Sequence, residues 1–152
     1  MHYIVVDLEW NQPMSFDSSV FRQVGDRLVF EMIQIGAVKV VDGRITDKFS
    51  SFVNPDVPIP FDIEKLTGIN DSMVLPYPKI DVILPQFLEF VGDRPLAAHN
   101  AEFDISFIRA GCRKVGLPFD PTYVDSLILA QNLLPELGKY KLDTVSYTHL
   151  TL

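Results

Sequence analysis

The sequence has a single cysteine, Cys112, which excludes an intrachain disulfide framework and favours the cytosol. No apolar run is long enough to cross a membrane, and no basic N-terminal region precedes an apolar core. We therefore expect a cytoplasmic protein without membrane contact. Basic residues are also few, with 13 Lys and Arg against 20 Asp and Glu and a net charge of −7. This balance argues against a broad electrostatic footprint for duplex nucleic acid, but it leaves room for an enzyme whose metal ions screen phosphate locally.

The chain has 152 residues and 47% hydrophobic residues, which fits one globular domain. The apolar patterning predicts a strand over 2–10, an irregular loop over 11–26 and two strands, 31–41 and 44–53, joined at Asp42-Gly43 in an antiparallel meander. It then predicts alternating helices and short strands: helices over 62–66, 80–91, 101–115 and 125–134, and strands over 95–98 and 121–124. The pattern indicates an α/β domain with a mixed sheet over residues 1–145. Residues 146–152 depart from it and are expected to form a non-native or disordered tail.

Two carboxylates, Asp7 and Glu9, end the first predicted strand. Because side chains alternate along a strand, both project from the same face. The apolar run before them indicates a strand covered on both sides, where two like charges would repel each other and resist desolvation. A divalent cation such as Mg²⁺ or Mn²⁺ would relieve both penalties. The alternative is that the strand reaches the surface and both carboxylates are simply solvated.

A third carboxylate, Asp104, follows the turn His99-Asn100 and lies in the first turn of the predicted helix 101–115. Asn100 is a natural N-cap whose side-chain oxygen would accept a first-turn N–H, and the helix dipole favours an anion at Asp104. Phe103 is one helical turn from Phe107, as in core packing. Taken alone, Asp104 is more readily explained as a surface acid near a helix start, and His99 is more often a satisfied turn histidine than a ligand.

In order along the chain, these segments resemble the DnaQ-like 3′–5′ exonucleases of the DEDDh group, which have an RNase H-like fold: Asp7-Leu8-Glu9, the strand from Glu31, Leu66-Thr67-Gly68-Ile69, His99 to Asp104 and Val124-Asp125-Ser126-Leu127. The stretch 133–145 looks most like the proofreading exonuclease domains of Gram-positive replicative polymerases. The opening Asp7-Leu8-Glu9-Trp10-Asn11 is closer to stand-alone bacterial exonucleases of the RNA-trimming branch, so the resemblance leaves DNA and RNA open as substrates.

The resemblance implies a role for each matching position. Asp7, Glu9 and Asp104 would be the catalytic carboxylates and would hold two divalent cations, Mg²⁺ or Mn²⁺. A larger set would contact the 3′ end of single-stranded DNA or RNA: Leu8, Trp10, Thr67, Gly68, His99, Asn100 and Phe103. Asp125 matches a position that looks structural, so it is left out of the metal set. A DNA polymerase is a candidate partner.

The family's third motif, a His followed four residues later by the last metal-binding Asp, has no match. His149 is the only histidine after residue 104, and no Asp follows Asp143. We therefore expect a C-terminally truncated domain that lacks a ligand and the general base, has impaired activity and exposes apolar surface through which copies associate. A non-catalytic module that binds nucleic-acid ends or proteins is the alternative. A different carboxylate-metal phosphohydrolase would not account for the block from His99 to Asp104.

Overall fold

The computed structural model describes residues 1–11 and 31–142. Most of the loop expected over 11–26, and the tail expected over 146–152, lie outside these residues. The described elements alternate much as the patterning predicts, and their bounds are β1 His2–Trp10, β2 Met32–Val41, β3 Arg44–Phe52, α1 Phe61–Thr67, α2 Asp71–Val74, α3 Ile80–Val91, β4 Leu96–Ala98, α4 Ala101–Val115, β5 Tyr123–Asp125 and α5 Ser126–Leu133.

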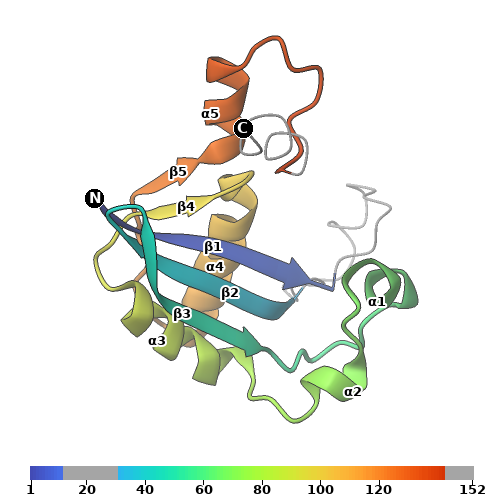
Figure 1. The fold of residues 1–152 in the computed structure, drawn as a ribbon. Coiled ribbons are helices and arrows are strands. Elements are labelled where there is room, and N and C mark those ends of the chain that lie inside the picture. The colour runs from blue at the N-terminus through green and yellow to red at the C-terminus, as the bar shows by residue number, and fades with distance from the viewer. Residues whose placement is uncertain (12–30, 143–152) are drawn as a thin grey trace.

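The five strands form one mixed sheet in the order β3-β2-β1-β4-β5. β1, β2 and β3 are antiparallel neighbours, and β4 and β5 add in parallel beside β1 (Figure 1). The β2–β3 hairpin turns at Asp42 and Gly43, both with positive φ, as a tight turn between twisted strands requires. The expected α/β class with a mixed, RNase H-like sheet is confirmed.

The helices α3 and α4 both pack on one face of the sheet (Figure 1). Along β1, Ile4, Val6 and Leu8 are buried against this helical layer, whereas Val5 and Asp7 are exposed on the opposite face. The expectation that β1 is covered on both sides is therefore wrong for the described part of the chain. The apolar run was misleading because it includes Val5, which occupies an exposed strand position. A branched side chain favours the β conformation even where it is not buried.

Helix packing behind the sheet depends on small side chains and tolerates an internal proline. α3 continues through Pro85 to Val91. A Cβ built on Gly111 of α4 would lie 2.8 Å from Cδ1 of Leu84 in α3, which shows how closely the two helices approach. Cys112 next to it is 1% exposed and packs as a small apolar side chain.

The short helix α2 was not predicted. Its signal is Asn70, whose side-chain oxygen accepts the N–H of Met73 and so caps the first turn. Together with α1, it lies beyond the C-terminal end of β1 (Figure 1).

Candidate active site

The end of β1 presents Asp7 and Glu9 on the face opposite the helical layer. Asp7 pairs with Gly36 of β2, and the ladder is irregular between Glu9 and Trp10. Burial raises the pKa of Asp7, partly offset by a hydrogen bond from the backbone N–H of Leu8. Burial also raises the pKa of Glu9, and the charge of Asp7 adds to this rise. Each carboxylate therefore has surroundings that favour its neutral form unless a cation is present.

Asp104 comes to the same place from α4. It is in the first turn of that helix and only 4% exposed. Its pKa is raised to about 7, most of all by burial and then by the charges of Asp7, Glu9 and Asp125 in that order.

The three carboxylates fit a divalent cation by chemistry. They provide hard oxygen donors and mutual repulsion that a cation would remove. In the described part of the chain, however, no three acidic, histidine or cysteine side chains are already drawn together as a coordination shell. Asp7 and Glu9 would therefore be the ligands on β1, with Asp104 facing them across the site.

Aromatic packing joins the end of β1 to the first turns of α4. The Trp10 ring stacks on Phe107 with centroids 4.9 Å apart and on Phe103 with centroids 6.2 Å apart. Phe103 remains 42% exposed, so part of its ring is available to a ligand beside the carboxylates. Leu8 differs from the expectation of a substrate contact: it is 4% exposed, and its side chain belongs to the core on the opposite face from Asp7.

Thr67 and Gly68 end α1 at the same end of the sheet (Figure 1). The Thr67 hydroxyl donates to the carbonyl of Ile63 and accepts the N–H of Ile69. Gly68 has a φ of 76°, a left-handed conformation that favours glycine at a helix C-terminus. The structure brings this turn to the site's end of the sheet, but it records no contact between the turn and the carboxylates.

His99 and Asn100 form the turn before α4. The Nε2 atom of His99 lies 2.8 Å from the carbonyl oxygen of Tyr140, which can only accept, so this nitrogen carries the proton. The other nitrogen, Nδ1, lies 3.0 Å from the Ser126 hydroxyl. Both ring nitrogens are thus engaged within the protein, which agrees with the turn-histidine alternative.

Asn100 is the N-cap residue of α4, as predicted, but the capping hydrogen bond expected from its side chain is not formed. Asn100 has a φ of 62° and its side chain makes no capping hydrogen bond. The carboxylate of Asp125, at the end of β5, accepts the N–H groups of Asn100 and Ala101 instead, each at 2.9 Å. The same carboxylate accepts the N–H of Leu127 at 2.9 Å and so also caps α5. Sequence reasoning took Asp125 as structural but missed the bonds across the sheet, since nothing local indicates them.

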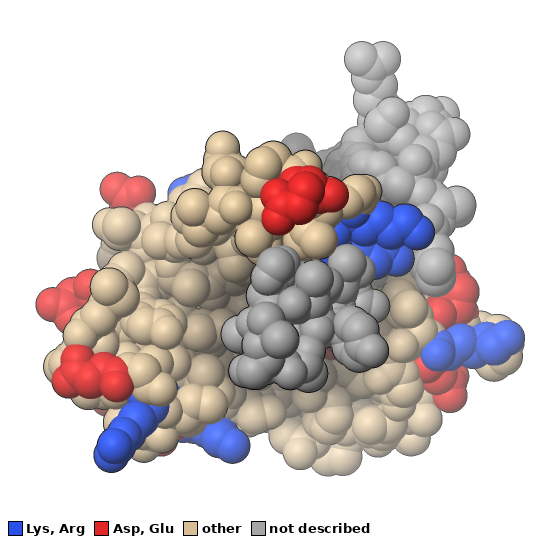
Figure 2. All heavy atoms as spheres, turned by 45° about the horizontal axis from the view of Figure 1, so that its top comes forward, with Lys and Arg blue, Asp and Glu red and all other residues tan. Residues whose placement is uncertain are grey.

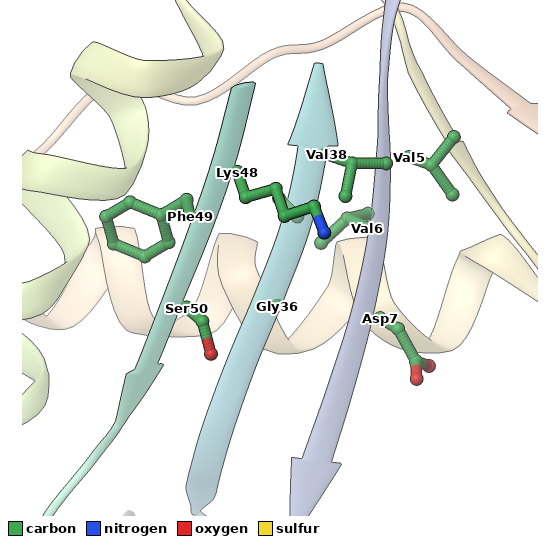
Figure 3. A pocket seen from close by; sticks show the side chains of 9 residues that line it. Val5, Val6, Asp7, Gly36, Val38, Lys48, Phe49 and Ser50 are labelled. Carbon is green, nitrogen blue, oxygen red and sulfur yellow. The ribbon is translucent and has the colours of Figure 1, made fainter. Parts of the chain in front are cut away.

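The exposed sheet face beside Asp7 is slightly hollowed. Figure 3 shows the side chains of Val5, Asp7, Val38, Lys48 and Ser50 around this depression, with Gly36 at its floor. Among the described residues visible in Figure 2, the lysine and arginine side chains lie in separate spots. This distribution agrees with an enzyme that contacts few phosphates.

Comparison with known proteins identifies the class. The family model described as Exonuclease matches residues 17–149, a range that includes Asp104 and begins after Asp7 and Glu9. Two sequence relatives are PolC-type DNA polymerases III: one from Clostridium perfringens is 42% identical over 95% of this chain, and one from Caldanaerobacter subterraneus is 49% identical over 76% of it. The chain spans 9% and 8% of these relatives' own lengths.

Solved structures with the same fold are also exonucleases. Exonuclease X in complex with 5′-overhanging duplex DNA aligns with a TM-score of 0.70 and 25% identity, covering 97% of this chain and 73% of the other. The nuclease domain of 3′hExo, a DEDDh family member bound to rAMP, aligns with a TM-score of 0.71 and 16% identity, covering 90% of this chain and 71% of the other. The second likeness concerns the fold alone.

The chain belongs to the exonuclease family. By family it is a 3′–5′ exonuclease domain, which confirms the resemblance drawn from its motifs. Members of this family generally use divalent metal ions. None of the helices within the described residues is long and apolar enough to span a membrane.

Proposed function

We propose that this chain hydrolyses phosphodiester bonds at the 3′ end of single-stranded DNA and releases nucleoside monophosphates. The observation that carries the proposal is the nearly buried Asp104 carboxylate, whose pKa is raised by burial and by the charges of Asp7 and Glu9. Three such groups in one place are costly without a counter-charge. DNA is proposed over RNA because the sequence relatives are DNA polymerases.

The positions of the residues support the roles that the family resemblance implies. Asp7 and Glu9 would bind Mg²⁺ or Mn²⁺ directly, and Asp104 would act on an ion through water. Two bound ions would supply charge stabilisation for the attacking and leaving oxygens. The exposed part of Phe103, with Trp10 stacked behind it, would support the terminal base, and the turn at Thr67 and Gly68 would border the same nucleotide. Stacking of this kind reads no base code, so we expect little sequence preference.

The proposal also covers the polymerase partner, the activity of this chain and the roles of His99 and Leu8. Because the relatives are PolC-type DNA polymerases III, we propose that the domain proofreads within such a polymerase in the cytoplasm. Because the sequence has no His-x4-Asp pattern after Asp104, we expect hydrolysis by this 152-residue chain to be slow while metal binding persists. His99 and Leu8 are assigned to structure, since one is hydrogen-bonded at both ring nitrogens and the other is buried.

The test measures metal binding and hydrolysis separately. Trp10 is the only tryptophan and adjoins Glu9, so bound paramagnetic Mn²⁺ should quench its fluorescence. Degradation is followed on a 5′-labelled single-stranded DNA oligonucleotide with Mn²⁺. We expect saturable quenching and slow shortening from the 3′ end, both lost in Asp7→Ala and both kept in Asp93→Ala, which alters an exposed carboxylate in the turn before β4.

Two outcomes would contradict the proposal. Quenching that Asp7→Ala leaves unchanged would remove the metal site from β1. Mn²⁺ binding without any shortening of DNA would favour the non-catalytic binding module, and the same assay with an RNA oligonucleotide would show whether the choice of DNA was wrong.

A further inference from the structure

The start of α4 is held by a residue of the neighbouring strand. Asp125 pairs with Ala98 across the β4–β5 ladder, and its carboxylate receives the N–H groups of Asn100 and Ala101. Asn100 has no capping hydrogen bond of its own and adopts the left-handed conformation, which is uncommon for residues other than glycine. The bonds to Asp125 are what stabilise this turn.

The turn determines where Asp104 lies. Ala101 is the first residue of α4 and is fully buried, and Asp104 follows it within the same helical turn. A rotation or shift of the helix start would therefore move the Asp104 carboxylate away from Asp7 and Glu9. Ser126, the first residue of α5, attaches the same turn a second time. Its hydroxyl lies 3.3 Å from the carbonyl oxygen of Ala98 and 3.0 Å from His99 Nδ1.

We infer that Asp125 is a positioning residue, which holds the first turn of α4 so that Asp104 completes the carboxylate cluster with Asp7 and Glu9. The inference rests on the proposed function, because it assumes that these carboxylates bind a cation together. Both oxygens of Asp125 are occupied by backbone N–H groups, so it acts through the position of Asp104 and not as a ligand itself.

The experiment compares Mn²⁺ affinity, measured by Trp10 quenching, in wild type, Asp125→Asn and Asp125→Ala. Both variants remove the same charge, but only alanine removes every acceptor atom. Loss of a residue that orients a metal ligand typically weakens metal binding about 10–100-fold, and we expect Asp125→Ala to fall in that range. Asp125→Asn keeps one acceptor oxygen and should stay within about threefold of wild type. Circular dichroism confirms folding of each variant, and if Asp125→Ala does not fold, Asp125→Ser takes its place.

A residue that only stabilises the fold would lower the melting temperature of the metal-free protein and leave the Mn²⁺ affinity of the folded protein unchanged. That result, or equal weakening in Asp125→Asn and Asp125→Ala, would overturn the inference; equal weakening would indicate a charge effect. The Asp7→Ala control separates this failure from failure of the proposed function. If wild type binds no Mn²⁺, or if Asp7→Ala binds it equally well, both the function and the inference are wrong.

Discussion

Asp104 shows at the scale of a single residue how burial and like charges act together. Its pKa is about 7 in the folded protein, raised from the ordinary aspartate value of 3.8 by burial and by the charges of Asp7, Glu9 and Asp125. An acid whose folded pKa exceeds its unfolded pKa binds more protons in the folded state between those two values. Stability of the metal-free protein therefore falls as pH rises through this window.

Asp104→Asn should remove this pH-dependent loss. In buffer with a chelator, we expect the variant to be more stable than wild type at pH 8 by about 2 kcal/mol, about half of what the full shift implies because the site is partly solvated. The melting temperature should rise by about 4–8 °C at pH 8 and by much less at pH 5. Thermal unfolding between pH 4 and pH 9 measures the difference, with Asp93→Asn as a control on an exposed carboxylate. If the melting temperatures of wild type and Asp104→Asn changed with pH in parallel, the buried charge of Asp104 would not lower the stability of the protein.

Metal affinity should depend on pH in the opposite direction. Protons compete with Mn²⁺ for the Asp104 carboxylate, so affinity should rise as pH increases through about 7, where this group ionises. Titration of Trp10 fluorescence with Mn²⁺ between pH 5.5 and pH 8.5 would follow this, and affinity that stays constant across the range would count against a role for Asp104.

At the scale of elements, the contact between α3 and α4 determines how the helical layer lies on the sheet. Gly111 allows Leu84 to approach the α4 backbone, and Leu84 is fully buried. In Gly111→Val, the new Cβ would lie only 2.8 Å from Leu84 Cδ1, and the two methyl groups of valine would add to this clash. We expect a loss of about 2 kcal/mol in the free energy of unfolding, since overpacking exceeds the gain in helix propensity.

Urea unfolding measures this loss. Ser106→Val introduces the same side chain on the exposed face of α4, at a residue whose helix propensity is close to that of valine, and should change stability little. Equal stability of Gly111→Val and wild type would mean that α3 moves away without cost.

At the scale of the whole molecule, apolar side chains remain on the surface of α5. Ile128, Leu129 and Leu133 are 55%, 47% and 73% exposed. Because exposed apolar surface favours association, we propose that copies of this chain associate weakly through α5. The pair Ile128→Lys and Leu133→Glu, which keeps the net charge, should weaken association about 10–100-fold.

Sedimentation velocity over a range of protein concentrations tests this prediction. Val82→Lys with Met73→Glu is the matched control, since these residues are exposed apolar positions on α3 and α2. A wild-type chain that stays monomeric at every concentration would contradict the association, and a control pair that weakens it equally would place it elsewhere.

Local patterns predicted most of the fold. The helices at 80–91 and 101–115 have the predicted bounds, because their apolar spacing and the glycine after each helix act within a few residues. The hairpin at Asp42-Gly43 was predicted for the same reason. An error arose where a partner distant in sequence decides: the hydrogen bonds that cap α4 come from Asp125.

The sequence by itself determined the identity of the carboxylates and their order along the chain, since Asp7 and Glu9 share a strand face and Asp104 follows a helix start. It also predicted the α/β class and the exonuclease family. Only the tertiary structure decided which face of β1 is open, that His99 is bound at both ring nitrogens and that Asp125 anchors α4. The reason is that burial and hydrogen bonding depend on which elements become neighbours, and parallel pairing of β4 with β5 joins residues about 27 positions apart.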